Sequence, residues 1–266
     1  MKRDIFIQLA ILGILTASCK KDIDIDYHQV EPLYVVEASV SNDGMKATIS
    51  RTNNMDDNTT AYDISRATVI ITGSDNSRET LDYQGKGVYF SKTKGTPEVE
   101  YTIQIDIDGH HFTSSSTMHE MPEINEFRFI RKKILRENYQ MGKLLLQDIP
   151  NEDNYYFAHL YRNKKGYRWA LKKDDTDPNK ELQVLFTFAR EGSDDEDLLK
   201  EGDRIRLEVR TIDRKSYDYL YSMQIMDNSG TNPIPNFTGG CLGYFSAYSQ
   251  FTSEYIFHEA DVKDEI

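Results

Sequence analysis

Cysteine is scarce in this chain of 266 residues, which contains only two, Cys19 and Cys241. A protein class that depends on several disulfides for its stability is therefore excluded. Cys241 lies in a short, glycine-rich apolar segment, residues 239–243, and no histidine is near it in the sequence. Because a catalytic thiolate needs a basic partner, we predict that Cys241 is a buried and unreactive thiol.

A long hydrophobic run is also missing. The apolar stretch at residues 5–15 is interrupted by Gln8, whereas a membrane-spanning helix needs about 20 apolar residues. The stretch follows a basic start and precedes three small residues, an order typical of a secretory signal peptide. Because Cys19 stands directly after the expected cleavage point, we predict that residues 1–18 are a lipoprotein signal peptide and that Cys19 carries the lipid. An ordinary secretory signal and an uncleaved anchor are the alternatives.

Positive charge is in deficit. The chain has 32 Lys and Arg against 44 Asp and Glu, a net charge of −12, and removal of residues 1–18 with Lys2, Arg3 and Asp4 leaves −13. Nucleic acid is excluded as a partner, because binding would have to overcome repulsion by the phosphates. The same balance argues against an anionic lipid as a direct ligand. The negative net charge is consistent with an acidic, soluble protein body that a lipid anchor holds at a membrane.

The first half of the chain shows short strand patterns separated by turns. In residues 101–107, Tyr and Ile alternate with polar residues, as expected for a strand with one buried face. Asp108 and Gly109 then predict a hairpin turn into residues 111–114. Further strand patterns lie at residues 33–38, 68–72 and 88–90. Because no helix pattern occurs here, we predict an immunoglobulin- or transthyretin-like β-sandwich over residues 33–120.

The second half, residues 121–266, is predicted to be a β-rich part with one helix. Strand patterns lie at residues 127–130, 143–147, 155–161, 167–171, 182–188, 204–211 and 243–249. The helix begins after Asp213 or Ser216, either of which can cap it, and ends near Gly230. Its aromatic side chains at helical spacing predict packing against the core. Residues 19–32, rich in Asp, indicate a lipidated tether ahead of both β parts.

Known catalytic motifs are absent from the sequence, including the His-Glu-x-x-His zinc site, the phosphate-binding glycine loop and the Gly-x-Ser-x-Gly elbow. His110 and His111 adjoin two aspartates, but neighbouring strand residues point to opposite faces, so a shared metal ion is not expected. The acidic run around Asp194 predicts a solvated loop, with weak calcium binding as the alternative. We therefore expect no catalytic residue, cofactor or metal. A hydrolase that uses an unrecognised pair of carboxylates stays open.

Tyrosine is abundant, with 17 residues, and the sequence brings several aromatic residues together in one region. The candidates for ligand contact are Tyr155, Tyr161, Tyr167 and Trp169. Tyr and Trp supply large contact areas at a low cost in conformational entropy and are frequent in binding sites. They are also common strand residues. A purely structural role is therefore the alternative.

Several segments occur together in a recognisable order. Cys19 and its acidic tether precede residues 31–37 (EPLYVVE), 154–157 (NYYF), 216–220 (SYDYL) and 242–247 (LGYFSA). In these features the chain resembles a family of Bacteroidetes lipoproteins known as a domain of unknown function. Members are commonly encoded beside TonB-dependent outer-membrane receptors, and the family has no established catalytic residues.

The resemblance implies a non-enzymatic accessory protein, anchored at the outer membrane, that binds a ligand or pairs with a TonB-dependent receptor in nutrient uptake. A structural or adhesion lipoprotein at the cell surface is the alternative function. The sequence leaves the ligand, the face of the membrane and the oligomeric state open.

Overall fold

The computed structural model describes residues 31–53, 64–150, 153–174, 181–193, 196–229 and 233–265. Residues Pro32–Ile266 form one compact unit. The predicted signal peptide, Cys19 and nearly all of the predicted tether lie outside the described residues, as does Asp194 in the acidic run.

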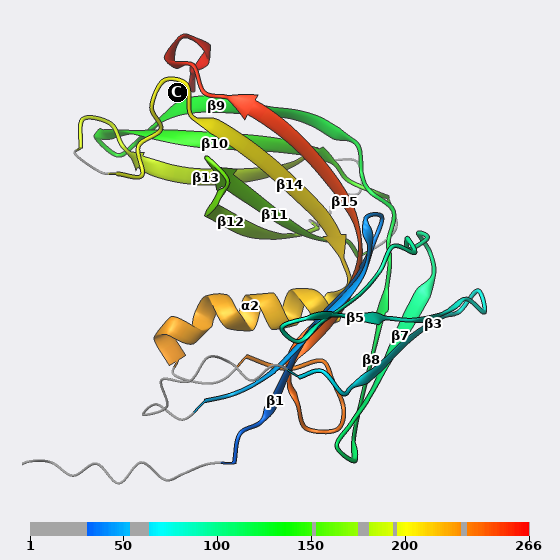
Figure 1. Cartoon of the computed structure of the whole chain (residues 1–266). Coiled ribbons are helices and arrows are strands. Elements are labelled where there is room, and N and C mark those ends of the chain that lie inside the picture. The colour runs from blue at the N-terminus through cyan, green and yellow to red at the C-terminus, as the bar shows by residue number, and fades with distance from the viewer. Residues whose placement is uncertain are drawn as a thin grey trace, which may run out of the picture. The chain divides into compact units, whose positions relative to one another are not determined.

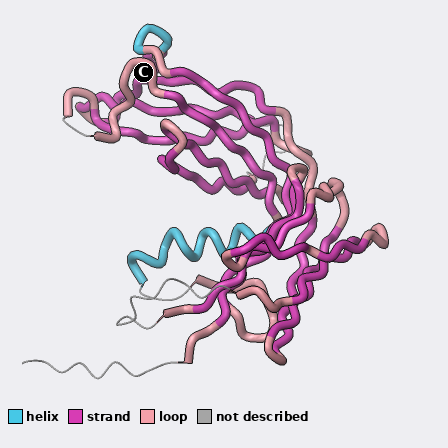
Figure 2. The backbone as a smooth tube through the Cα atoms, viewed as in Figure 1, coloured by secondary structure: helices cyan, strands magenta, loops and turns pink. Residues whose placement is uncertain are grey.

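The fold is mainly β, as predicted, and strands dominate the backbone in Figure 2. The strands are β1 (Tyr34–Ser41), β2 (Gly44–Arg51), β3 (Thr68–Gly73), β4 (Arg78–Thr80), β5 (Asp82–Gly85), β6 (Val88–Ser91), β7 (Glu100–Ile107), β8 (His110–Thr117), β9 (Ile124–Ile134), β10 (Glu137–Gln147), β11 (Tyr155–Arg162), β12 (Lys165–Lys173), β13 (Glu181–Arg190), β14 (Arg204–Ile212), β15 (Leu242–Ile256) and β16 (Lys263–Glu265). Among the described residues, the helices are α2 (Arg214–Ser229) and the short 3₁₀ helix η1 (Glu259–Asp261).

The strands of the described residues form three sheets. An eight-stranded sheet has the order β12-β11-β14-β15-β1-β2-β6-β5, and two four-stranded sheets have the orders β13-β10-β9-β16 and β4-β3-β7-β8. Successive side chains of a strand point to opposite faces of its sheet. One face of the eight-stranded sheet is covered by the two four-stranded sheets, one over each half. The inward side chains of the eight-stranded sheet are therefore divided between two separate cores.

The first core is the predicted N-terminal sandwich. Alternate residues of β1, namely Val36, Ala38 and Val40, pack with Ile103 and Ile105 of β7. All five side chains are buried, which for β7 is what the alternation in the sequence predicted. The Asp108-Gly109 turn between β7 and β8 is also confirmed, since both residues have positive φ values.

The second core has the same construction. Tyr156, Ala158 and Leu160 of β11 and the matching residues of β14 pack against strands β9, β10 and β13. The C-terminal half is therefore a second sandwich, which builds on the same eight-stranded sheet as the first.

Strand β15 runs through both halves, as Figure 1 shows. Its first part pairs with β1 in parallel, from Val35 opposite Leu242 to Ser41 opposite Tyr248, and its second part pairs with β14. Phe245 thus enters the first core although it lies far beyond the predicted boundary at residue 120. Both predicted β parts contribute strands to the first sandwich.

Helix α2 begins where the sequence predicted. The side chain of Asp213 accepts a hydrogen bond from the backbone N–H of Ser216 at 2.8 Å, which caps the helix. Tyr217 and Leu220 pack against a small third cluster of buried residues. The prediction that the whole aromatic stripe packs was wrong for Tyr221, which is exposed.

The chain ends in what we call the C-terminal clasp, the segment η1 to β16, whose last strand pairs in parallel with β9. Three of its four carboxylates form ion pairs with cations of β9 and β10. Arg131 binds Glu259 and Asp264 at 2.7 and 2.8 Å. Glu265 binds Arg128 at 2.6 Å and Lys143 at 2.8 Å.

Candidate functional site

The face of the eight-stranded sheet turned away from the two cores, here called the outer face, carries an unusual row of rings and charges. Strand β11 contributes Phe157, His159 and Tyr161, and strand β14 contributes Arg206, Glu208 and Arg210. The pairing of the two strands sets a ring opposite a charge at each step: Phe157 faces Arg210, His159 faces Glu208, and Tyr161 faces Arg206.

The rings of β11 are in contact with one another and with β12. The centroids of His159 and Tyr161 are 4.1 Å apart, and those of Phe157 and Trp169 are 5.9 Å apart. Trp169, the single tryptophan of the chain, remains 37% exposed. Side chains of this size at successive outward positions leave a continuous aromatic surface on the sheet.

A buried carboxylate holds the charges of the outer face together. Glu208 is only 3% exposed, and it accepts a hydrogen bond from Arg206 at 3.1 Å and a short one from Arg210. The guanidinium of Arg206 lies 3.8 Å from the centroid of the Tyr161 ring, and that of Arg210 lies 4.4 Å from the ring of Tyr248. Hydrogen bonds and cation–π contacts therefore fix both arginines in place.

These surroundings also shift the titration of the rings. Burial lowers the pKa of His159, and the nearby Arg210 and Arg206 lower it further, while Glu208 opposes them. Burial raises the pKa of Tyr161. At neutral pH both rings are uncharged, so the formal charges of the row are those of its two arginines and its glutamate.

Two cavities open on the outer face. One has a volume of about 520 Å³ and is lined by Tyr161, Lys164, Arg204, Ile205, Arg206, Glu254, Tyr255 and Ile256. The other has a volume of about 300 Å³ and is lined by Glu37, Ala38, Ser39, Lys46, Thr48, Arg210, Tyr244 and Tyr248. The row of rings and charges on β11 and β14 reaches both, because Arg206 lines the first and Arg210 the second. The larger volume is in the range of small-molecule sites.

Helix α2 covers one end of this face. Its Tyr217 ring lies 5.0 Å from Tyr155, and its Tyr219 ring stacks on Tyr244 at 4.4 Å. Burial raises the pKa of Tyr244 to about 12. Tyr155 is therefore a packing residue under the helix, whereas Tyr161 lies at the end of β11 that lines the larger cavity.

The structure brings three of the four predicted aromatic residues onto the outer face and separates the fourth. Tyr155, Tyr161 and Trp169 share this face, while Tyr167 packs on the opposite side against Phe188. The register of β11 and β12 shifts between Leu160 and Tyr161. This β-bulge leaves Tyr167 without a partner on β11 and turns it toward the core.

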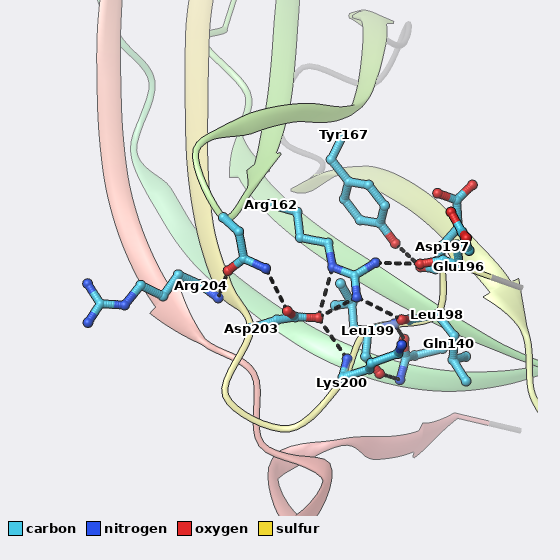
Figure 3. A network of polar contacts seen from close by, with 11 residues as sticks. Gln140, Arg162, Tyr167, Glu196, Asp197, Leu198, Leu199, Lys200, Asp203 and Arg204 are labelled. Carbon is cyan, nitrogen blue, oxygen red and sulfur yellow. Dashed lines mark hydrogen bonds and ion pairs between the residues drawn. The ribbon is translucent and has the colours of Figure 1, made fainter.

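Tyr167 belongs to a polar network beside the second core, which Figure 3 shows. Its hydroxyl donates a short hydrogen bond to the backbone carbonyl of Asp197. Beside it, Arg162 binds Asp203 at 2.6 Å and donates to the carbonyl of Leu198 at 3.0 Å. Arg204 points away from the network. The network anchors the loop before β14, so Tyr167 is structural.

The described residues give little support to a reaction centre. Groups of three or more His, Cys, Asp or Glu that could hold a metal ion do not occur among them. Three cavities of the described part of the chain each contain one carboxylate, from Glu254, Glu37 and Glu120 respectively. None of these three cavities therefore holds a pair of carboxylates.

Cys241 is buried and unpaired, as predicted. Burial raises the pKa of its thiol to about 11, so the thiolate is rare at neutral pH. Within the part of the chain that the structure describes, none of the helices has the length and apolar character needed to cross a membrane.

Comparison with known proteins places the chain in a family without assigning its chemistry. A family model described as a domain of unknown function, DUF4249, matches residues 20–254. The chain belongs to this family. The matched residues thus include the whole of the first core and most of the outer face and of the second core. Curated proteins include no match. Among solved structures, a two-domain fibronectin type-III segment of chicken tenascin is similar, with 8% identity over 85% of this chain and 100% of that chain and a TM-score of 0.24.

Proposed function

We propose that this DUF4249 protein is a lipid-anchored accessory protein of the outer membrane that pairs with a TonB-dependent receptor in nutrient uptake, and that its outer face contacts both a ligand and the receptor. The lipoprotein signal pattern around Cys19 supports the anchor. The resemblance to Bacteroidetes lipoproteins encoded beside such receptors supports the pairing.

The outer face carries the proposal, because stability alone does not explain its composition. The solvent side of an antiparallel sheet is usually polar, yet β11 places three rings there in succession. Trp169 adds a fourth ring and leaves a third of its surface exposed. Aromatic and arginine side chains of this kind are the residues that most often dominate binding energy.

The arrangement suits a ligand with both apolar and polar groups. The rings offer apolar contact, and the charges beside them are held rigid before any ligand arrives, so little conformational entropy is lost on binding. The cavity next to Tyr161 adds the cations of Lys164 and Arg204 and the carboxylate of Glu254. A ligand bound there meets both hydrogen-bond donors and acceptors.

The test is copurification from membranes of the native host. A tagged protein with the double substitution Tyr161→Ala and Trp169→Ala is compared with the parent, and TonB-dependent receptors are identified by mass spectrometry. We expect the parent to retain a receptor and the double variant to lose most of it, because truncation of the exposed Trp169 and the half-buried Tyr161 removes contact area without touching either core. Tyr83→Ala, a similarly exposed tyrosine on β5, is the matched control and is expected to retain the receptor.

Two results would contradict the proposal. Equal recovery of a receptor by the parent and the double variant would remove the outer face from the interaction. Recovery of the parent without any receptor, together with release of the body by protease treatment of intact cells, would favour the adhesion function instead. A Cys19→Ala variant that fractionates with membranes as the parent does would disprove the lipid anchor.

A further inference from the structure

The turn between β9 and β10 ends in an exposed apolar tip. Strand β9 ends at Ile134 and β10 begins at Glu137, so Leu135 and Arg136 form a two-residue turn. Leu135 is 95% exposed and Ile134 is 42% exposed. A leucine with this exposure adds almost nothing to the packing of the folded chain.

Leu135 is also an unfavourable residue for the backbone of this turn. Its φ is 57°, while Arg136 does not have a positive φ. A positive φ at the first turn position alone is the pattern of a type II′ turn, in which that position is normally glycine. A side chain with a Cβ is strained in this region. Neither packing nor turn geometry therefore accounts for a leucine here.

Three cations surround the tip: Lys132, Lys133 and Arg136. None of them makes an ion pair with another residue that the structure describes. Two carboxylates beside the tip are engaged elsewhere. Glu137, the residue after the turn, pairs with Arg190 at 3.6 Å, and Glu265, opposite Lys132, is bound by Arg128 and Lys143. The tip therefore combines two exposed apolar side chains with three uncompensated positive charges, in a chain whose net charge is −12.

We propose that this tip, residues 132–136, contacts an anionic bilayer surface, with Leu135 and Ile134 inserted between lipids and the three cations on the headgroups. Two side chains on a two-residue turn are far smaller than a specific protein interface, which buries about 800 Å² on each partner. A bilayer accepts a small apolar tip, and basic residues beside it are attracted to anionic headgroups. The acidic net charge does not prevent the contact, because salt screens charges beyond about 10 Å.

Vesicle cosedimentation tests this contact without the lipid anchor. The protein is residues 32–266, the compact unit that contains both cores, and the vesicles are phosphatidylcholine alone or phosphatidylcholine mixed with phosphatidylglycerol. We expect binding to the mixed vesicles only. Leu135→Gly should weaken it about tenfold while the urea midpoint of unfolding does not fall, because glycine relieves the strained turn.

The charged part of the tip is tested separately. The triple variant Lys132→Gln, Lys133→Gln and Arg136→Gln should weaken binding to the mixed vesicles by on the order of 100-fold, since each basic residue near an anionic surface contributes about 1 kcal/mol. Ile234→Ala is the matched control, because Ile234 is a 64% exposed apolar residue far from this turn in the sequence. It should bind as the parent does.

Three outcomes would overturn the proposal. They are equal binding of the parent to both kinds of vesicle, unchanged binding of Leu135→Gly, and unchanged binding of the triple variant. If the parent binds neither kind of vesicle but Leu135→Gly weakens copurification of the receptor, the tip contacts the receptor and not the bilayer. The outer-face variants of the proposed function should bind vesicles normally, so the two proposals can fail independently.

Discussion

Gly243 lies where β15 meets β1, and its replacement by alanine should be among the most damaging single changes in this chain. Its φ is 98°, and a Cβ at this position would lie 1.9 Å from the carbonyl oxygen of Val36, far inside the ordinary contact distance of 3.4–4 Å. The obstacle is backbone and cannot rotate away. Strands β1 and β15 would have to move apart, against the 4.7–4.9 Å spacing that their hydrogen bonds require.

The expected loss in the free energy of unfolding has two parts, which a matched control separates. An alanine held at positive φ lowers the free energy of unfolding by about 1–2 kcal/mol at any position in the chain. Gly85 has nearly the same φ, 97°, and nothing within 4 Å of its added Cβ, so Gly85→Ala measures this part alone. Gly243→Ala adds the loss of parallel pairing between β1 and β15. We expect a total of roughly 4 kcal/mol or more, a large share of the stability of an ordinary domain.

Urea unfolding followed by the fluorescence of Trp169 and by far-ultraviolet circular dichroism measures both variants. Gly85→Ala should show a small drop in the midpoint, and Gly243→Ala should unfold at much lower urea or be recovered unfolded. The reasoning is refuted if the two variants have the same midpoint. Equal values would mean that β1 and β15 do not approach each other as closely at Val36 as the structure shows.

Three further predictions concern local chemistry. Asp213→Ala should lower the free energy of unfolding by about 1 kcal/mol in urea titrations, because it removes the cap that Ser216 uses; Asp213→Asn should restore most of it. Cys241 should resist iodoacetamide at pH 8 in the native protein and react within minutes in urea, because burial raises its pKa to about 11; rapid native labelling would show that the thiol is exposed. His159 has a lowered pKa in the folded state, chiefly through burial, so the unfolded chain binds more protons and stability falls as the pH drops through the ordinary histidine value of about 6.5. His159→Gln should flatten that slope, and an identical pH profile in parent and variant would contradict the shift.

Much of the local structure could be predicted because it depends on nearby residues. The strict alternation of β7 and the Asp108-Gly109 turn predicted the hairpin, and Asp213 marked the start of α2. Strand β2 was missed although its sequence also alternates, because residues such as Met45 and Ala47 have little strand preference.

The partners of each strand could not be predicted. Alternation tells which residues share a face, but it does not tell that β1 pairs with a strand from the opposite end of the chain. For the same reason the sequence predicted a second β part without showing that it shares a sheet with the first.

The candidate site was predicted in part. Tyr161 and Trp169 were identified from their clustering, and β14 already showed Arg206, Glu208 and Arg210 at alternate positions, a signal that would have placed them on one face. Their contact with the rings of β11 depends on strand register, which the sequence did not provide. Tyr167 was misplaced because a β-bulge, invisible in the residue pattern, reverses its direction.

The parallel pairing of β1 with β15 also orders the folding of the chain in time. Asn42 and Gln250, which exchange hydrogen bonds at the end of this pairing, are 208 positions apart. A ribosome releases the N-terminal strands first, so β1 has an unpaired edge until nearly the whole protein has been made. Contacts this distant in sequence form slowly, and an open edge can pair with another chain. The first sandwich is thus completed only when the last long strand, β15, has been made, and any truncation before Leu242 should leave an aggregation-prone product.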